Sequence, residues 1–562
     1  MITATGTKTT TASVTRNPNR RGHCAVLAVL FAMGMSAAEA ATTWYVDSTG
    51  NDANTCTAPG PFGACQTIQG AINKAAAGDT INVAAGTYLE PAPGPLTVNK
   101  TLTLLGAQAG VDARTRAGAE SIVNDLQGTS VSASGVVIDG FTVQNSTVAA
   151  FTGFGIWLNP GVSGTTIVNN IIQNNIVGMG LANSGAQALI RHNLIQNNNQ
   201  PGGASGTGIY TDEFVGGSVV RNVLIQENAF KGHVDAGIDV SNTDPAGGAF
   251  NLDIWTNSFD MNGRATVLFN THDSTIHDNS ITNSTFVGSA AVRLFDNNTN
   301  LSILDNDLVM GAGHAIRLSD LGLVGGPSSG VVINENNIGT VGFASFALDG
   351  LLVDPGSHVG TVNAECNWWG SPTGPTDPIN NPSGTGEEVV GDADYTPWLT
   401  SPAPSGACVG PSTPGKVTGG GQILGDDPVF SSLGDLISVP ALVPSLASPG
   451  SQATFGFVVK CCAPTGNLEY NDHQAGVRIK SQSVSGLFIS SPGTACPATP
   501  GSKHAKFAGM AAVIRSTGTT TETYTVDVDD CGEPGSADTF GIKTTTYSNG
   551  PSMLIGGNIQ IH

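Results

Sequence analysis

A short unit repeats between about Phe154 and Phe346, and it restricts the possible folds more than any other feature of the sequence. Each copy has an apolar residue, two polar residues, an asparagine and a second apolar residue one position further on. Where no copy is degenerate, neighbouring copies lie 22 to 30 residues apart, which indicates a repeat architecture. The clear copies contain Asn170, Asn193, Asn257, Asn279, Asn306 and Asn336, and a degenerate copy, Val220 to Ile225, follows the second.

A second short strand precedes each copy, as in Gly155 to Leu158, Gly237 to Val240 and Ala291 to Leu294. These segments alternate apolar and polar residues, so each has one buried face. A unit of two or three strands cannot bury that face alone, but copies stacked ~4.8 Å apart close a continuous core. Leucine-rich repeats have a similar period, but here Ile and Val fill the apolar positions and no helix pattern separates the strands. The sequence predicts an all-β, right-handed parallel β-helix in which the turn asparagines form an inward ladder.

The segment from Trp44 to Tyr88 resembles the start of the pectin-lyase-like superfamily. The matching residues are Trp44-Tyr-Val-Asp47, Gly50-Asn-Asp52, Thr67-Ile-Gln69, Ala76-Ala-Gly-Asp79, Thr80-Ile-Asn-Val83 and Gly86-Thr-Tyr88. The resemblance covers roughly residues 43–399 and implies a helix that covers the first coil. Ile68, Ala71, Ile72 and Ala75 form the apolar face of such a helix. Asn367-Trp-Trp-Gly370 resembles the aromatic segment that covers the last coil in this superfamily, so Trp368 and Trp369 are expected to be buried.

Residues 1–40 have the organisation of a secretion signal, with a positive n-region, a 12-residue apolar stretch from Cys24 to Met35 and Ala38-Glu39-Ala40 at its end. The apolar stretch is too short to cross a bilayer, and no later stretch is long enough. The remaining chain has 18 Lys and Arg against 42 Asp and Glu, a net charge of −24. Such an acidic chain argues against nucleic acid as a partner. We predict a secreted, extracellular or cell-surface protein without a transmembrane segment.

The part after the repeats has a different pattern. Residues 400–416 are rich in Pro, Ser and Gly and are predicted to be a linker. Alternating segments beyond it predict an antiparallel β-sandwich over residues 417–562. Val417-Thr-Gly-Gly-Gly-Gln-Ile423 and Gly532-Glu-Pro-Gly535 resemble the post-COAP module of secreted bacterial proteins, which implies a fold and a location but no activity. The predicted domains are therefore a signal peptide at 1–40, a helical cap at 41–78, the β-helix at 79–399, the linker and the sandwich.

Eight cysteines remain after removal of the signal, and an exported chain is expected to pair them. Cys56 and Cys65 close a short loop and are predicted to form a disulfide, as are Cys366 and Cys408. The pairing of Cys461, Cys462, Cys496 and Cys531 stays open. No Cys-x-x-Cys occurs, which argues against zinc. The run Asp527-x-Asp529-x-Cys531, closed by Asp538, approaches a calcium loop, but the cysteine favours a strand and turn, so Ca²⁺ stays open and no cofactor is assigned.

One strand of each repeat carries the residues that suggest a function. In the superfamily that the chain resembles, substrate lies along one outer sheet, and alternate side chains of its strands point outward. The predicted outward positions run from aromatic through acidic to basic. They are Trp157, Gly180, Tyr210, Asp239, Leu268, Arg293 and Arg317, with Asp212, Glu213, His272, Asp296 and Asp320 at the strand ends. Two neighbouring arginines repel each other unless Asp296 and Asp320 neutralise them or an anion bridges them.

The column predicts a groove for an extracellular, acidic polysaccharide or a cell-surface glycan. The expected substrate-binding residues are Trp157, Tyr210, Asp212, Arg293 and Arg317, and the expected catalytic residues are Asp239 and His272. If the protein is an enzyme, the resemblance implies a polysaccharide lyase or a glycoside hydrolase, and the sequence leaves catalysis open. The alternatives are two surface Arg–Asp pairs that bind nothing, a non-catalytic adhesion or spacer protein, and a periplasmic metal-binding β-helix that uses His272, His277 and His314.

Overall fold

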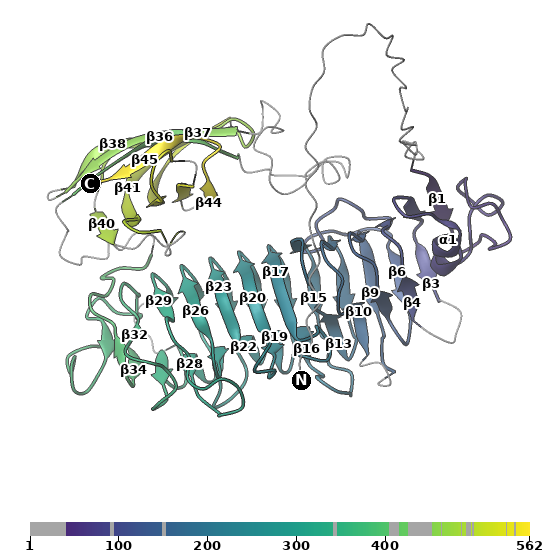
Figure 1. Cartoon of the computed structure of the whole chain (residues 1–562), viewed down its shortest axis with the longest axis horizontal. Helices are drawn as coiled ribbons and strands as arrows, with labels where there is room; N and C mark the ends of the chain where they lie inside the picture. The colour runs from purple at the N-terminus through teal and green to yellow at the C-terminus, as the bar shows by residue number, and fades with distance from the viewer. Residues whose placement is uncertain are drawn as a thin grey trace, which may run out of the picture. The chain divides into compact units, whose positions relative to one another are not determined.

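The computed structural model describes residues 41–89, 95–148, 153–340, 345–403, 415–424, 452–461, 464–484, 486–490, 496 and 499–562, the last range without 517, 536, 545 and 546. The predicted signal peptide and most of the predicted linker lie outside these ranges. In the described residues the regular structure is β apart from one short helix, and three long parallel sheets form a right-handed β-helix (Figure 1). The predicted fold class is confirmed.

Most coils contribute one strand to each of three sheets. Sheet A contains β1 (Thr43–Val46), β2 (Thr80–Val83), β5 (Thr103–Leu105), β8 (Val137–Asp139), β11 (Thr166–Val168), β14 (Ala188–Arg191), β17 (Val219–Gln226), β20 (Gly248–Trp255), β23 (Thr271–His277), β26 (Thr299–Leu304), β29 (Val332–Asn334), β32 (Val362–Asn363) and β35 (Ala393–Asp394). Sheet B contains β3 (Gly86–Tyr88), β6 (Ser121–Asn124), β9 (Phe141–Gln144), β12 (Ile171–Gln173), β15 (Leu194–Gln196), β18 (Ala229–Lys231), β21 (Ser258–Asp260), β24 (Ser280–Thr282), β27 (Asp307–Leu308) and β30 (Asn337–Ile338).

Sheet C carries the candidate site. Its strands are β4 (Leu96–Val98), β7 (Thr129–Val131), β10 (Phe154–Leu158), β13 (Val177–Gly180), β16 (Thr207–Thr211), β19 (Ala236–Ser241), β22 (Arg264–Phe269), β25 (Ala290–Leu294), β28 (His314–Leu318), β31 (Leu351–Val353), β33 (Pro375–Thr376) and β34 (Gly386–Val390). Neighbouring coils pair in parallel and in register, so equivalent residues of successive repeats stack directly. The column Ile167, Ile190 and Ile225 in sheet A is one such inward stack, and these side chains are fully buried. The repeated apolar positions therefore become the continuous core.

Helix α1 (Ile68–Lys74) covers the N-terminal end of the core. Thr67 caps it, because its side chain accepts a hydrogen bond from the backbone N–H of Gly70 at 2.9 Å. Ile68, Ala71 and Ile72 are fully buried, and Ala75 at the end of the helix is also buried. At the other end of the repeats Trp368 and Trp369 are buried. Both expected caps are present, and each covers a sheet edge that would otherwise be open.

The turn asparagines form a ladder between sheets A and B. After Asn170, whose side-chain oxygen accepts the backbone N–H of Phe141, each side-chain oxygen accepts bonds from the backbone N–H and the amide of the asparagine one coil earlier. Asn279 accepts these bonds from Asn257 at 2.8 and 3.0 Å. The buried ladder is longer than predicted and contains Asn170, Asn193, Asn228, Asn257, Asn279, Asn306, Asn336 and Asn367. The left-handed backbone falls on the residue before each ladder asparagine, for example Asp278 with φ 54°, and not on the asparagine itself.

A second ladder lies between sheets B and C, five residues after the first. Its buried members are Asn175, Asn198, His233 and Asn262. His233 replaces an asparagine in this column. Its Nδ1 lies 2.8 Å from the side-chain oxygen of Asn262, and its Nε2 lies 3.2 Å from the amide nitrogen of Asn198. These contacts assign a neutral imidazole that donates from Nδ1 and accepts at Nε2.

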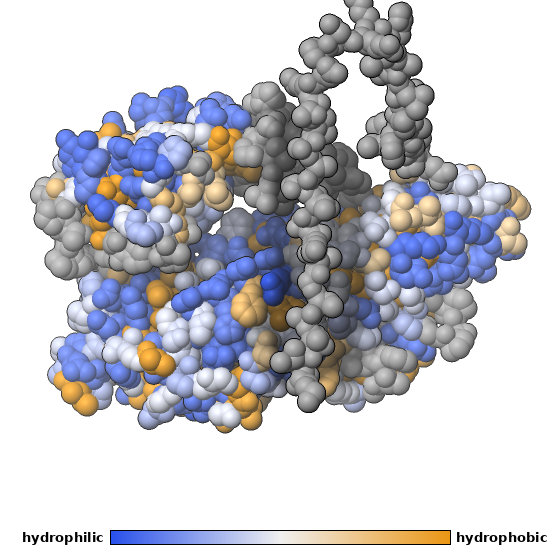
Figure 2. All heavy atoms as spheres, viewed as in Figure 1, coloured by the Kyte–Doolittle hydropathy of each residue, from blue (hydrophilic) through white to orange (hydrophobic). Residues whose placement is uncertain are grey.

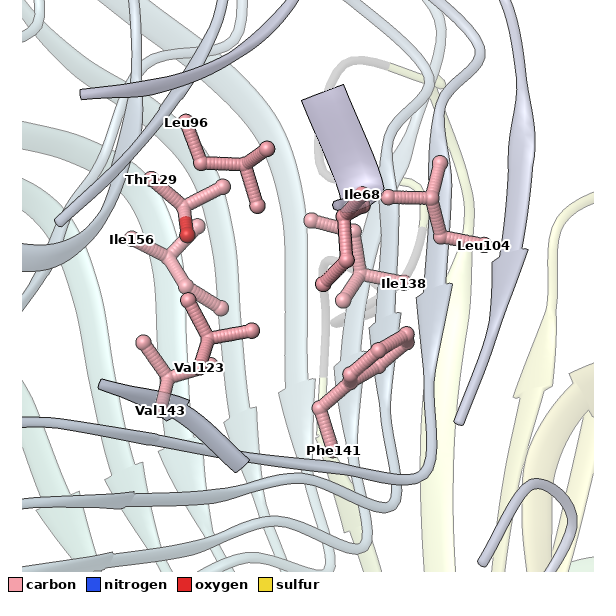
Figure 3. Close-up of a pocket in the computed structure, with 9 residues that line it drawn as sticks. All are labelled: Ile68, Leu96, Leu104, Val123, Thr129, Ile138, Phe141, Val143 and Ile156. Carbon is pink, nitrogen blue, oxygen red and sulfur yellow. The ribbon is translucent and has the colours of Figure 1, made fainter. Parts of the chain in front are cut away.

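A small apolar pocket lies inside the first coils, under Ile68 of α1 (Figure 3). Its lining is aliphatic and aromatic except for Thr129, whose Oγ1 is buried and has no hydrogen-bond partner among the described residues. A buried hydroxyl without a partner destabilises the folded state. The pocket therefore indicates incomplete packing near the cap, inside a lining that is otherwise apolar.

Replacing Thr129 by valine is expected to raise the free energy of unfolding by about 1 kcal/mol, because it removes this unpaired hydroxyl and keeps the volume of the side chain. Thr142→Val is the matched control, since the buried Thr142 hydroxyl donates to Glu120 Oε2 at 3.0 Å and its loss is expected to destabilise. Denaturant titration of both variants measures the difference. Equal shifts for the two would contradict the assignment.

The C-terminal part is a single antiparallel sheet that curls over its own core. Sheet D contains β36 (Lys416–Leu424), β37 (Gln452–Lys460), β38 (Thr465–Asp472), β39 (Val477–Ser481), β40 (Gly486–Ser490), β41 (Lys503–Arg515), β42 (Gly518–Asp530), β43 (Thr539–Thr544), β44 (Tyr547–Met553) and β45 (Gly556–Ile561). Its core is aromatic: the rings of Phe455 and Phe457 pack near Phe540, and Phe507 packs against Phe457. The antiparallel all-β class is as predicted, and the strands pair in one continuous half-barrel sheet.

Two disulfides are placed by the structure. Cys56 and Cys65 pair as predicted, and Cys496 pairs with Cys531, which resolves one pairing that the sequence left open. Cys366 is also disulfide-bonded. Its predicted partner, Cys408, lies outside the described residues, so that pairing stays a prediction.

Candidate functional site

The outward side chains of sheet C form a column with one residue per coil. In register, Trp157 pairs with Gly180, Gly180 with Tyr210 and Tyr210 with Asp239. The column continues through Val267, Arg293 and Arg317 to Leu352. Adjacent strands lie ~4.8 Å apart, so the column is a continuous strip across the coils. The predicted sequence of aromatic, acidic and basic positions is present.

One position of the predicted column is wrong. Leu268 is buried inside the β-helix, and Val267 takes the outward position. The sequence alignment placed the segment Thr266 to Phe269 one residue out of register with the preceding copy. In the structure Thr266, and not Val267, pairs with the inward residue Ile238. A shift of one residue moves every side chain of a strand to the opposite face.

The aromatic end of the strip is held by a loop that follows β16. The indole N–H of Trp157 donates to the backbone oxygen of Val215 at 3.2 Å, and the hydroxyl of Tyr210 donates to Asp212 Oδ2 at 2.9 Å. Gly180 lies between the two rings, and a Cβ there would come within 2.7 Å of Trp157 Cδ1. The glycine therefore leaves room for the indole. Both rings are half-buried, so each keeps part of its surface in solvent.

Asp239 stands at the centre of the strip and is the most perturbed carboxyl there. It is 8% exposed, and the Ser241 hydroxyl donates to its Oδ1. Burial, helped by the charges of Asp235 and Asp212, raises the pKa of Asp239 to about 7, against the hydrogen bond from Ser241 and the charge of Arg264. A carboxyl with this pKa exchanges a proton near neutral pH.

The other two acidic side chains at this level are held by backbone groups. Asp212 Oδ1 accepts the N–H groups of Phe214 and Val215 at 2.9 and 2.6 Å. Glu213 accepts both the N–H and the hydroxyl of Thr243 at 3.0 Å, which ties the loop after β16 to the next coil. Asp212 therefore orients the loop and the Tyr210 ring, as well as lying beside the strip.

The two arginines differ in accessibility. Arg293 is 5% exposed, lies 4.0 Å above the Phe295 ring and donates to the Ser319 hydroxyl at 2.6 Å. Burial and the neighbouring Arg317 lower the pKa of Arg293 to about 10. Arg317 keeps 27% of its side chain exposed and donates from Nε and an Nη to Asp354 Oδ2 at 3.1 and 2.9 Å. Arg317, and not Arg293, is the arginine that solvent can reach.

The predicted partners of these arginines are wrong. Asp296 is buried and accepts the backbone N–H groups of Leu321, Leu323 and Val324, and Asp320 accepts that of Gly322 at 2.8 Å. The carboxylate that neutralises Arg317 comes from Asp354, 37 residues further along the chain. Parallel coils bring such distant residues together, and the local sequence gave no sign of it.

The structure does not bring His272 and Asp239 onto one sheet. His272 lies in β23 of sheet A, where it stacks on Phe250 and bonds to Thr299 and Asn270. His277 bonds to Asp253 and Asp278, and His314 to Asp349. Among the described residues these three histidines form no common metal-ligand cluster. The paired use of Asp239 and His272 that the sequence suggested therefore has no support in the geometry.

The face of the molecule that Figure 2 shows is mainly hydrophilic. On the face shown in Figure 2, hydrophobic residues form small separate patches among hydrophilic ones. In the part of the chain that the structure describes, no helix is both long and apolar enough to cross a membrane.

Comparison with known proteins identifies the fold of the central coils. Residues 103–259 match the family described as right handed beta helix region. No curated protein matches the chain. Solved structures with similar folds include the pectate lyase Pel9A, with 16% identity, 64% of this chain and 79% of that chain covered and a TM-score of 0.28. A GH136 lacto-N-biosidase from Eubacterium ramulus is 14% identical, with 63% of this chain and 67% of that chain covered and a TM-score of 0.32. The phiAB6 tailspike in complex with oligosaccharides of an Acinetobacter baumannii surface polysaccharide is 13% identical, with 86% of this chain and 80% of that chain covered and a TM-score of 0.25.

Proposed function

We propose that the outer face of sheet C binds an extracellular, acidic polysaccharide that runs across the coils. The observation that carries this proposal is the in-register strip from Trp157 through Tyr210 and Asp239 to Arg317. A polymer lying along this strip meets two partly exposed aromatic rings, a protonatable carboxyl and a guanidinium in turn. Aromatic faces pack on apolar sugar surfaces, and a guanidinium pairs with a carboxylate through its planar fork.

The accessible cation is Arg317, and its pairing with Asp354 is consistent with a binding role. In the free protein Asp354 neutralises the guanidinium, and a carboxylate of the polymer competes for the same donors. Arg293 is assigned to the support of Arg317, because it donates to the backbone oxygen of that residue at 3.2 Å. Ser319 links Arg293 to Asp354, since its hydroxyl contacts both. The basic end is thus a preorganised group with one exposed member.

Asp239 is the residue that we assign to proton transfer if the bound polymer is cleaved. With a pKa of about 7, roughly half of this carboxyl carries a proton at neutral pH, as a general acid requires. Absorbance at 235 nm and reducing ends distinguish the reaction types, because a lyase produces both and a hydrolase only reducing ends. Asp239→Asn is expected to remove either signal and to retain binding.

Replacing Arg317 by glutamine is expected to weaken binding of polygalacturonate by about tenfold or more, because one charge-assisted pair is lost. Affinity electrophoresis of the full chain in gels with polygalacturonate or a neutral glucan measures the effect. Arg478→Gln is the matched control, since Arg478 forms an exposed pair with Glu469 in sheet D and the change in net charge is the same.

Equal retardation of the two arginine variants would place the binding site elsewhere. No retardation of the wild-type protein by any polymer would favour a rigid spacer without a ligand. An extracellular location is supported by the disulfides Cys56–Cys65 and Cys496–Cys531, which persist in oxidising compartments.

A further inference from the structure

Three potential metal ligands converge on sheet D. His504 on β41 lies directly opposite Asp529 on β42, and Asp527 projects from the same face of β42, two residues earlier. His504 Nδ1 lies 3.4 Å from Asp529 Oδ1 and 3.6 Å from Asp527 Oδ1. His504 and Asp529 are 8% and 2% exposed, while Asp527 keeps 32% of its side chain exposed. Two carboxylates and an imidazole thus meet at a site that solvent reaches from one side.

The manner of this approach differs from an ordinary histidine–carboxylate pair. His277 in the β-helix also has two carboxylates, but Asp278 bonds to its Nδ1 and Asp253 to its Nε2, each at 2.9 Å. At His504 both oxygens face the same nitrogen, at 3.4 and 3.6 Å. Two carboxylates and one imidazole nitrogen thus converge on one point, as ligands do around a shared cation.

Two of the distances match those between ligands of a small divalent ion, and all three ligand atoms lie within 4.8 Å of one another. Zn²⁺ binds imidazole nitrogen and carboxylate oxygen at about 2.0–2.2 Å, so ligand atoms on a tetrahedral ion lie about 3.3–3.6 Å apart. Asp529 Oδ2 accepts the Thr539 hydroxyl at 3.0 Å, which fixes the orientation of the carboxylate that would bind the ion. An imidazole ligand and only two carboxylates suit a first-row transition metal better than Ca²⁺.

The negative charge of the cluster also favours a bound cation. Two carboxylates, Asp527 and Asp529, face the single imidazole of His504. Lys506, which lies opposite Asp527 in the register, is the nearest cation of β41. A divalent ion and a proton compete for the same nitrogen, so metal binding weakens as the pH falls.

The calcium loop considered from the sequence is not formed. Asp538 accepts the backbone N–H groups of Cys531 and Ile559 at 2.9 and 2.8 Å, and Cys531 is in a disulfide. The two aspartates of that motif instead lie on a strand, where they face His504 across the sheet.

We propose that His504, Asp527 and Asp529 form a binding site for one divalent first-row transition-metal ion, with Zn²⁺ as the best match and a fourth position open to water or a ligand. The site belongs to the C-terminal sheet and does not depend on the function proposed for sheet C.

Titration of the full chain with Zn²⁺ at pH 7.5, after removal of metal with a chelator, tests this proposal. Calorimetry is expected to show one equivalent of tight binding, and Co²⁺ in the same site is expected to give visible absorption bands of a four- or five-coordinate ion. His504→Asn and Asp529→Asn are expected to lose both signals. His277→Asn, the matched control with the same neighbours in a different arrangement, is expected to keep them.

A thermal melt shows whether the ligand variants fold. If His504→Asn does not fold, Thr539→Val decides, because it removes only the group that orients Asp529 and is expected to weaken Zn²⁺ binding by about tenfold or more. The proposal is overturned if the wild-type protein binds no stoichiometric Zn²⁺, if the folded ligand variants bind as well as wild type, or if His277→Asn causes the same loss.

Discussion

Replacing Asn279 by leucine is expected to lower the free energy of unfolding of the β-helix by about 4 kcal/mol. The side-chain oxygen of Asn279 accepts two bonds from Asn257, and its amide donates to the backbone oxygens of Ile254 and His277 and to Asn306. Leucine makes none of these bonds. Each buried donor that loses its partner costs about 1–3 kcal/mol, and Asn257 alone has two such donors.

Chemical denaturation followed by circular dichroism measures this loss, with Asn73→Leu as the control. Asn73 is exposed on α1, where its side chain accepts one bond from Gln69, and leucine is a good helix former. The control is expected to change stability by less than about 1 kcal/mol. Similar denaturation midpoints for the two variants would show that the ladder contributes little to the stability of the β-helix.

Acidification from pH 6.5 to 4 is expected to lower the free energy of unfolding by about 3 kcal/mol through His233, and replacing His233 by asparagine is expected to abolish this loss. Burial lowers the pKa of His233 to about 4, against the hydrogen bond that its Nδ1 donates to Asn262, which raises it. An unfolded histidine has a pKa of about 6.5, so between pH 6.5 and 4 the unfolded chain binds a proton that the folded chain does not. The free energy of unfolding therefore decreases as the pH is lowered from 6.5 to 4. Below pH 4 both states are protonated, and lowering the pH further causes no additional loss from this residue.

Asparagine at position 233 continues the second ladder and does not titrate. The variant is expected to match the wild-type protein near pH 7.5 and to become the more stable of the two as the pH falls to 4.5. Other groups that titrate in this range are common to both proteins and cancel in the comparison. His473→Asn, at an exposed position of sheet D, should leave the pH dependence unchanged. Parallel stability curves for wild type and His233→Asn would contradict the assigned burial.

The fold was predictable because one apolar and polar pattern recurs in every coil. Ile190, Asn193 and Ile195 describe a complete turn, and the neighbouring copies confirm its register. Asn228 was missed because the degenerate copy was aligned on Val220, five residues too early, whereas Ile225 is the residue that stacks on Ile190. The second ladder was visible as a polar residue five positions after each of the first four ladder asparagines, but His233 interrupts the run of asparagines and conceals it.

The candidate site was predictable only where it follows the repeat. Trp157, Tyr210 and Asp239 were placed correctly, because strand alternation fixes which side chains point outward. Burial of Arg293 and the pairing of Arg317 with Asp354 depend on the loops between coils, whose paths are not periodic. His272 was assigned to the end of a strand in sheet C, but Asn270 forms the corner and β23 begins at Thr271. The convergence of His504 with Asp527 and Asp529 depends on the strand register in sheet D. No sequence repeat covers this sheet, so its register could not be predicted from the sequence.

Hydrogen–deuterium exchange of the wild-type protein with and without a short oligogalacturonate tests the central claim most directly, because it locates the ligand without a substitution. The loop after β16, at Asp212 to Gly217, and the segment around Asp354 flank the strip on sheet C. The proposed function predicts that added oligosaccharide slows exchange in both segments and leaves peptides of sheets A and D unchanged. Protection confined to sheet A or sheet D, or no protection at a saturating concentration of the oligosaccharide, would contradict it.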